Sequence, residues 1–140
     1  MKKLLCMLLS VLFIFTVMAP GLCLAAEEEA FEPPVDIDEY SLTSSIAASL
    51  SISGGTAQVA GRVGAQYASA SCSIKVTLQK KNSNGTWSAV KSWSKSGGSS
   101  VSTGGSVSVS SGSYRTCVTA TITRGSDSEH PFVYSGTKTC

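Results

Sequence analysis

The sequence predicts a single all-β domain, an immunoglobulin-like or related antiparallel β-sandwich of about seven strands. Three observations support this prediction. Apolar and polar residues alternate along several segments, glycine and Asx clusters separate those segments, and only 14% of the 140 residues are charged. Alternation directs one set of side chains inward and the other outward along a strand. The short chain excludes a barrel enzyme or a two-lobed kinase, and its low charge excludes a coiled coil.

Residues 1–25 are predicted to be a secretory signal peptide. Two lysines follow the initial methionine, the segment Leu4–Ala19 is almost continuously apolar, and small residues come after it. This run is shorter than the roughly 20 residues needed to span a bilayer. We expect cleavage after Ala25, with cleavage after Ala26 as the alternative. A leucine precedes Cys23 where a lipoprotein needs a small residue, so the mature protein is expected to be secreted without a membrane anchor.

Residues 26–39 are predicted to form an acidic, flexible leader. This segment holds seven of the nine acidic residues of the chain and two adjacent prolines. Like charges repel and no apolar face repeats, so the segment cannot offset the entropy of ordering. The leader is expected either to be a solubilising spacer or to fold back on the basic domain and compete with an anionic ligand. Residues 40–140 carry nine Lys and Arg against Asp127 and Glu129 alone.

The β-sandwich domain is predicted to span residues 40–140, and 25 serines, 11 threonines and 12 glycines make up nearly half of this segment. The alternating segments predict strands at Leu50–Ile52, Ala57–Val63, Cys72–Leu78, Val107–Val109 and Tyr114–Ile122. Glycine and Asx clusters between them permit tight turns. The serine-rich segment 96–112 is expected to hold an edge strand, because its valines keep a spacing of two.

The dipeptide Asn84-Gly85 predicts a β-hairpin whose register decides where the two tryptophans lie. Without a bulge, Trp87 and Trp93 share the inward face of the preceding strand and pack in the core, which is the favoured interpretation. A one-residue bulge would place both rings outside, where aromatic rings can stack on sugars or anchor a partner. We therefore name Trp87 and Trp93, together with Lys91 and Arg115, as candidate ligand-binding residues.

Three cysteines remain after signal cleavage, which allows one disulfide and leaves one thiol. A C-terminal hairpin with its loop near Ser128 would place Cys117 opposite Cys140, and this is the favoured disulfide. An immunoglobulin-like alternative joins Cys72 to Cys117 across the sheets. Cys72 with Cys140, or a link between two chains, are further alternatives. In the favoured arrangement Cys72 is a buried thiol, because it shares the inward phase of its strand.

No catalytic constellation is recognisable, and we expect that the chain is not an enzyme and needs no cofactor. The domain has one histidine, His130, in the same loop as its two carboxylates, Asp127 and Glu129. Three neighbouring loop residues without a fourth ligand are more typical of a solvated turn than of a metal site, so no metal is expected. The chain contains no nucleophile-elbow serine, Cys-x-x-Cys pair or phosphate-binding loop.

Several strand and turn residues carry a resemblance. The patterns are Ile74-x-Val76-x-Leu78-Gln79-Lys80, then Asn84-Gly85-x-Trp87-x-x-Val90-x-x-Trp93, then Ser113-Tyr114-Arg115. Behind a signal peptide, they resemble small exported β-rich proteins of Gram-positive bacteria that belong to a domain family of unknown function. The resemblance spans roughly residues 45–125. It implies a bacterial, secreted β domain and no catalytic residues.

These observations together predict a secreted, non-catalytic binding module. Its ligand would be an extracellular or cell-surface glycan, an acidic wall polymer or a protein, held by basic and aromatic side chains. The alternative is a structural or self-associating surface protein that uses exposed strand edges. Nucleic acid is not an expected partner, because the basic residues are dispersed along the chain. The protein is expected to be a monomer or a disulfide-linked dimer.

Overall fold

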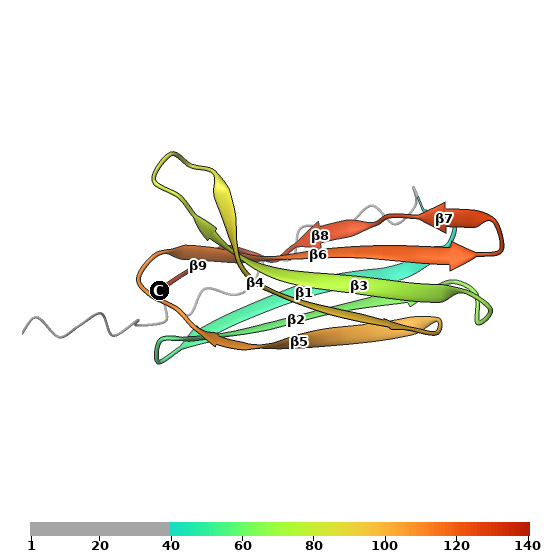
Figure 1. Cartoon of the computed structure of the whole chain (residues 1–140), viewed down its shortest axis with the longest axis horizontal. Coiled ribbons are helices and arrows are strands. Elements are labelled where there is room, and N and C mark those ends of the chain that lie inside the picture. The colour runs from blue at the N-terminus through green and yellow to red at the C-terminus, as the bar shows by residue number, and fades with distance from the viewer. Residues whose placement is uncertain (1–39) are drawn as a thin grey trace, which may run out of the picture.

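The computed structural model describes residues 40–140, which form two packed antiparallel sheets (Figure 1). The signal peptide and the acidic leader predicted for residues 1–39 lie outside the described residues. The strands in chain order are β1 (Thr43–Ser53), β2 (Thr56–Ala65), β3 (Ser71–Lys81), β4 (Trp87–Gly97), β5 (Ser100–Ser108), β6 (Ser113–Arg124), β7 (Asp127–Glu129), β8 (Phe132–Tyr134) and β9 (Lys138–Thr139).

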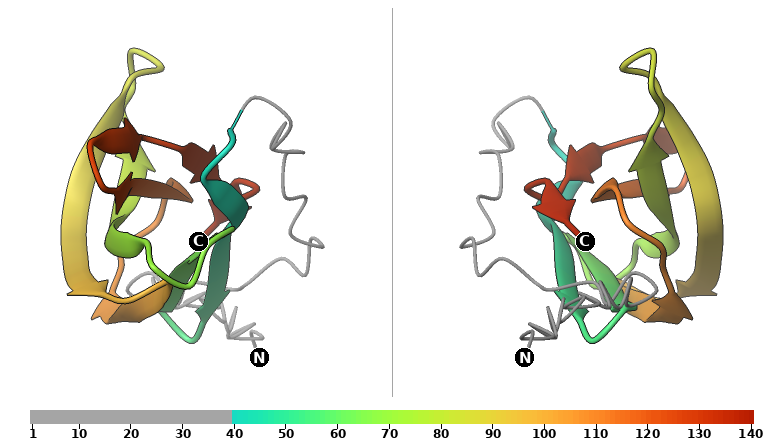
Figure 2. Two further views of the ribbon diagram at one scale, coloured as in Figure 1. Left: turned by 90° about the vertical axis from the view of Figure 1, so that its right-hand side faces the viewer. Right: turned by 90° about the vertical axis from the view of Figure 1, so that its left-hand side faces the viewer.

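The strand order confirms the predicted β-sandwich. One sheet has the order β1-β2-β5, and the other has the order β4-β3-β6, with β7, β8 and β9 all paired to β6. The last three strands form one interrupted path along β6, so the sandwich has seven strand paths. Strands β1, β2 and β5 pack against β3, β6 and the path formed by β7, β8 and β9. Strands A, B and E face strands C, F and G in the same way in immunoglobulin domains. Figure 2 shows the two layers from both ends.

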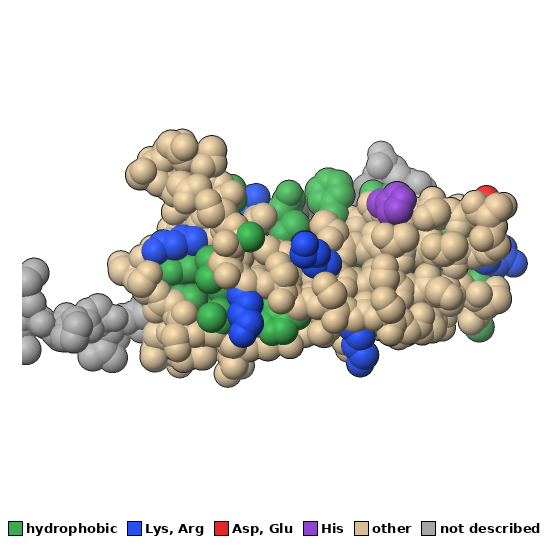
Figure 3. Space-filling model, in the orientation of Figure 1, with side chains coloured by type: hydrophobic (Ala, Val, Ile, Leu, Met, Phe, Trp, Pro, Cys, Tyr) green, Lys and Arg blue, Asp and Glu red, His purple; other side chains and the backbone are tan. Residues whose placement is uncertain are grey.

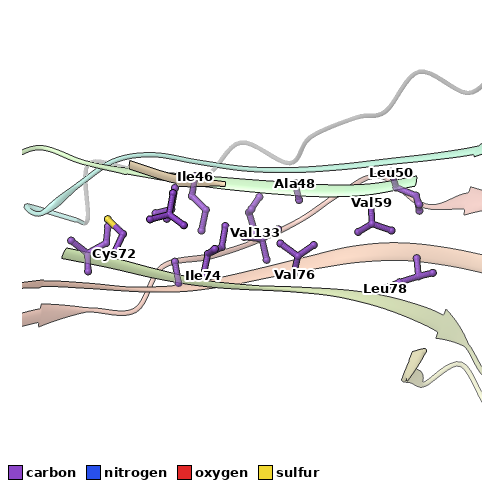
Figure 4. Packing of buried hydrophobic residues seen from close by; sticks show 14 of the residues in the cluster. Ile46, Ala48, Leu50, Val59, Cys72, Ile74, Val76, Leu78 and Val133 are labelled. Carbon is purple, nitrogen blue, oxygen red and sulfur yellow. The ribbon is translucent and has the colours of Figure 1, made fainter. Parts of the chain in front are cut away.

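The core consists of the inward side chains of both sheets (Figure 4). Residues of β1 and β2, such as Ile46 and Val59, face Ile74, Val76 and Leu78 of β3 across the interior. Along β3 every second side chain is buried, as the period of a strand requires. The apolar half of the alternating pattern therefore makes the core, and the hydroxyl-rich half lies outside.

Tyr114, at the start of β6, resembles the tyrosine corner of immunoglobulin domains. Its ring is buried, and its hydroxyl donates a 2.7 Å hydrogen bond to the carbonyl oxygen of Ser110, four residues upstream. A buried phenol needs such a partner to offset the loss of water. This bond fixes how the chain leaves the loop after β5 and enters β6.

Glycines at two of the predicted turns adopt backbone angles that other residues rarely reach. Gly54 and Gly55 both have positive φ and join β1 to β2 in a two-residue hairpin, in which Ser53 pairs with Thr56. Gly85 also has positive φ, within the hairpin that joins β3 to β4. The serine-rich segment 96–112 contains β5, which pairs with β2, so the predicted edge strand is confirmed.

The predicted Cys117–Cys140 disulfide is wrong. The turn after β6 is centred between Gly125 and Ser126, where Gly125 has positive φ, and not near Ser128. This earlier turn places Cys117 opposite Tyr134, whereas Cys140 exchanges backbone hydrogen bonds with Gly112.

The alternative pairings of Cys72, with Cys117 or with Cys140, are also wrong, because Cys72 and Cys117 are both free thiols. Neither of those two residues is therefore a disulfide partner of Cys140. The side chain of Cys72 is buried in the core, as its phase on the strand predicted.

Glu129, at the end of β7, holds the first residues of the described chain. Its carboxylate accepts hydrogen bonds from the backbone N–H groups of Ser41, Leu42 and Thr43 and from the hydroxyls of Ser41 and Thr43, at 2.7–3.1 Å. Burial raises the pKa of this carboxyl, but the hydrogen bonds from Leu42, Thr43 and Ser41 together lower the pKa by more than burial raises it. The pKa therefore lies below its ordinary value. This interaction links β1 of one sheet to β7 of the other.

We expect Glu129→Gln to destabilise the fold at neutral pH by about 1–3 kcal/mol, because a charged acceptor of several hydrogen bonds becomes neutral. A carboxyl whose pKa is lowered on folding stabilises the protein above its unfolded pKa, roughly 4.3, and this stabilisation disappears as the pH falls through the folded pKa. The melting-temperature difference between wild type and variant, measured by circular dichroism, should therefore shrink from pH 7 to pH 3. A constant difference would contradict the role of the carboxylate.

We expect Gly61→Ala to destabilise the sandwich by about 1–3 kcal/mol through overpacking. A Cβ atom at this position of β2 would lie 2.6 Å from Cγ2 of Val76 and 2.6 Å from Cγ2 of Val118. Gly98→Ala is the matched control, because a Cβ there would meet nothing within 4 Å. Urea unfolding of both variants tests this prediction, and equal midpoints would contradict it.

Candidate functional site

The outer face of the sheet β4-β3-β6, extended by β8, carries a regular grid of side chains. Pairing between the strands aligns these side chains in rows that run across the sheet. One row contains Ser94, Lys75, Thr119 and Phe132, and the next contains Ser92, Thr77, Cys117 and Tyr134. Successive rows are about 6.5 Å apart along the strands. Figure 3 looks onto this face, where the single histidine lies at the upper margin beside hydrophobic side chains.

An open groove of about 520 Å³ runs over this grid. The lining side chains on the outer face are Ser73, Lys75, Ser94, Ser96, Cys117, Thr119, Thr121, His130, Phe132 and Tyr134. Lys95 also borders the groove, but it alternates with Ser94 and Ser96 and pairs with inward Ile74, so its side chain leaves toward the other face. Short hydroxyl side chains form the floor, and the two rings of β8 form one wall.

Arg115 lies at one end of this surface, in close contact with two aromatic rings. Its guanidinium carbon is 4.3 Å from the centroid of the Trp87 ring and 4.0 Å from that of Tyr134. Its Nε–H donates a 2.8 Å hydrogen bond to Oε1 of Gln79. Tyr134 in turn makes an edge contact with Phe132, with their ring centroids 5.9 Å apart. A cation over an aromatic face is attracted by the ring quadrupole, so these contacts hold the guanidinium in place.

The two tryptophans lie on opposite faces of β4. The expectation that both rings pack in the core and the alternative that both lie outside are therefore each half wrong. A bulge in the β3–β4 pairing, between Leu78 and Gln79, separates the two tryptophans and reverses the side-chain parity. Trp93 pairs with Val76 and packs against the core. Trp87 pairs with Lys81 and lies on the outer face, where it meets Arg115.

Of the four predicted ligand-binding residues, the structure brings Trp87 and Arg115 together and separates them from Trp93 and Lys91. The Nζ atom of Lys91 lies 5.4 Å from the centroid of the Trp93 ring, on the inward side of β4. Trp93 also fills the space beside Gly105 of β5, where a Cβ atom would clash with its Nε1. Trp93 and Lys91 therefore belong to the margin between the sheets and not to the groove.

The groove also contains the half-buried thiol of Cys117. Burial raises the pKa of this thiol, while the positive charge of Arg115 and a hydrogen bond with Tyr134 lower it by less, so the pKa lies above its ordinary value. A protonated thiol is a poor nucleophile. At the other end of the groove, Nδ1 of His130 lies 3.2 Å from Oγ1 of Thr121.

The outer face of the sheet β1-β2-β5 has a different character. Its shallow hollows are lined mainly by serine, alanine, glycine and backbone, with Arg62 and Gln58 as the long polar side chains. The remaining basic residues are dispersed. Lys80 lies over the ring of Tyr114, and Arg124 stacks on Tyr67 with its guanidinium carbon 4.0 Å from the ring centroid. These contacts are isolated pairs of one cation and one ring. Within residues 40–140, several rings and cations lie together on one surface beside the groove.

Sequence reasoning missed Phe132 and Tyr134 as site residues. They flank buried Val133 in an apolar-looking triplet, and the alternation of a strand places both rings outside once Val133 faces the core. The alternation of this triplet could have predicted two outward rings. Which of its residues face outward, however, depends on the register that the preceding turn sets. Phe132 is 54% exposed, which is unusual for a phenylalanine in a small domain.

No family model, curated protein or solved structure matches this chain. Within residues 40–140, no three His, Cys, Asp or Glu side chains are grouped so that they could hold a metal ion. The same part of the chain has no helix that is long and apolar enough to cross a membrane.

The reactivity of Cys117 should report the charge of Arg115. Arg115→Gln removes a positive charge that lowers the thiol pKa, so the pKa should rise and alkylation by iodoacetamide at pH 8 should slow. Mass spectrometry of the modified protein gives the alkylation rate of each variant. Arg124→Gln, which removes the same charge beside Tyr67, should leave the rate unchanged. Equal rates in the Arg115 variant and the wild type would contradict the proximity of the two side chains.

Proposed function

We propose that this protein is a secreted, non-catalytic binding module, and that its ligand-binding surface is the groove on the outer face of β4-β3-β6-β8. The observation that carries the proposal is the guanidinium of Arg115, in contact with Trp87 and with Tyr134, which lines the groove together with the exposed ring of Phe132. Such rings are amphipathic anchors that bind partners at a low cost in conformational entropy.

The rigidity of this surface supports a binding role. Arg115, Thr119 and Lys75 project from β6 and β3, the central strands of the sheet, and Tyr134 is held by its ring contacts with Arg115 and Phe132. A ligand that binds a preorganised surface does not have to order flexible side chains first. A thiol is the most reactive nucleophile among the side chains of the groove. The raised pKa of Cys117 keeps this thiol protonated and argues against a nucleophilic role for it.

The predicted signal peptide places the ligand outside the cell. We infer that the ligand is a glycan, an acidic wall polymer or a protein at a cell surface. An open groove that spans several strands suits a ligand that lies across its surface better than a small compact molecule, which binding sites usually enclose.

The proposal predicts that Phe132→Ala abolishes or strongly weakens binding to a glycan array, because it removes an exposed ring from the groove wall. Phe132 is 54% exposed, so the fold should tolerate the change. Tyr67→Ala is the control, since this ring is 42% exposed but lies beside Arg124 outside the groove. A Phe132 variant that binds like the wild type, or an array on which the wild type binds nothing, would refute the role of this surface in glycan binding.

A structural or self-associating surface protein is the second candidate function. Strands β4 and β5 are edges of their sheets, and both are long, serine-rich and largely exposed. Exposed edges can pair with another chain. Sedimentation velocity over a range of protein concentrations separates this function from the first, because edge pairing gives a mass that rises with concentration.

A further inference from the structure

We propose that the ligand of the groove is an acidic polysaccharide whose sugars carry carboxylates, and that Arg115 binds those carboxylates directly. This inference rests on the proposed function and specifies the chemistry of its ligand. It follows from the hydrogen-bond donors that remain free on Arg115, from the charges around the groove and from the hydroxyl side chains of its floor.

The guanidinium of Arg115 is held in place by its neighbours, but most of its N–H donors make no hydrogen bond within residues 40–140. A guanidinium has five N–H donors, and the one on Nε binds Gln79. Among residues 40–140, the terminal nitrogens of Arg115 have no hydrogen-bond partner and no ion pair. A planar guanidinium with both terminal nitrogens free matches the two oxygens of a carboxylate. The contacts with Trp87 and Tyr134 fix the position of this group before a ligand arrives.

The charges along the groove have one sign. Lys75 lies on the same face as Arg115, about 13 Å further along the strands, because Arg115 pairs with Gln79. The Lys75 side chain is exposed and has no hydrogen bond or ion pair within the described residues. Among residues 40–140, no aspartate or glutamate lines the groove. Two cations on one face of the sheet, with no carboxylate beside them in the described part of the chain, favour a ligand with repeated negative charges.

The floor and wall of the groove suit a sugar backbone. The hydroxyl of Thr77 lies in the row between the two cations, and those of Thr119 and Ser94 lie beside Lys75 in its own row, each able to donate and to accept a hydrogen bond. The hydroxyls of a sugar have the same dual character. The exposed ring of Phe132 stands at the end of the row that contains Lys75, where it can cover the apolar face of a sugar ring. A purely inorganic polyanion would use the cations and leave this ring without a partner.

The test uses polygalacturonate as the probe and the same polymer with its carboxylates methyl-esterified as the matched neutral control. The purified full protein is titrated with each polymer by isothermal calorimetry, together with polyphosphate as an anion without sugars. Arg115→Gln is compared with Arg124→Gln, which loses the same charge from a tyrosine-stacked arginine outside the groove. Circular dichroism and melting temperatures confirm that each variant is folded.

We expect polygalacturonate to bind, to bind more weakly as salt increases, and to lose about tenfold or more in affinity in Arg115→Gln, with little change in Arg124→Gln. The esterified polymer should bind at least tenfold more weakly to the wild type. Equal affinity for polyphosphate, an equal effect of both arginine variants, or no binding of polygalacturonate would overturn the inference.

Failure of this inference can be separated from failure of the proposed function. If the esterified polymer binds as tightly as the acid and Phe132→Ala still abolishes binding, the groove binds glycans but not through their charge. That outcome overturns the carboxylate inference and keeps the binding module. If neither Phe132→Ala nor Arg115→Gln changes the binding of any polymer, both the inference and the role of this groove are wrong.

Discussion

The pairing of β3 with β6 is the constraint on which the rest of this structure depends. The two strands lie at the centre of the larger sheet and are in continuous register from Ser71 to Lys80. Because side chains alternate along a strand, this register sends Val76 and Val118 into the core together. The same register places Thr77 beside Cys117 on the outer face. One set of hydrogen bonds therefore fixes both the core and the groove, and a shift by one residue would exchange them.

Two local irregularities decide which side chains join the groove at its margins. The bulge in the β3–β4 pairing turns Trp87 outward while Trp93 stays against the core. On the other side of the sheet, the tight turn at Gly125 sets the register of β8, which brings Tyr134 beside Cys117. Arg115 lies between these margins and contacts rings from both. The aromatic and cationic cluster thus combines residues from three strands that are far apart in the chain.

The composition of the sheet explains why a groove exists on this face. Serine and threonine are small, so the rows between β4 and β6 form a low floor, and the rings of Phe132 and Tyr134 rise beside it. The other outer face has the same small residues but no comparable wall of rings within the described part of the chain. Hydroxyl-rich strands keep the outer surface polar and hydrated, while a few large side chains rise above it.

The sequence by itself determined the sandwich, the hairpin at Asn84-Gly85, the edge strand within 96–112 and the buried position of Cys72, because each depends on a local pattern of alternation or turn residues. It also singled out Trp87 and Arg115, which the structure places in contact. Only the tertiary structure decided that Trp93 faces inward, that Cys117 does not pair with Cys140 and that Phe132 and Tyr134 line the groove. The physical reason is that period-two alternation defines two faces but not their phase across a turn or bulge, and one residue of difference moves a side chain from one face to the other.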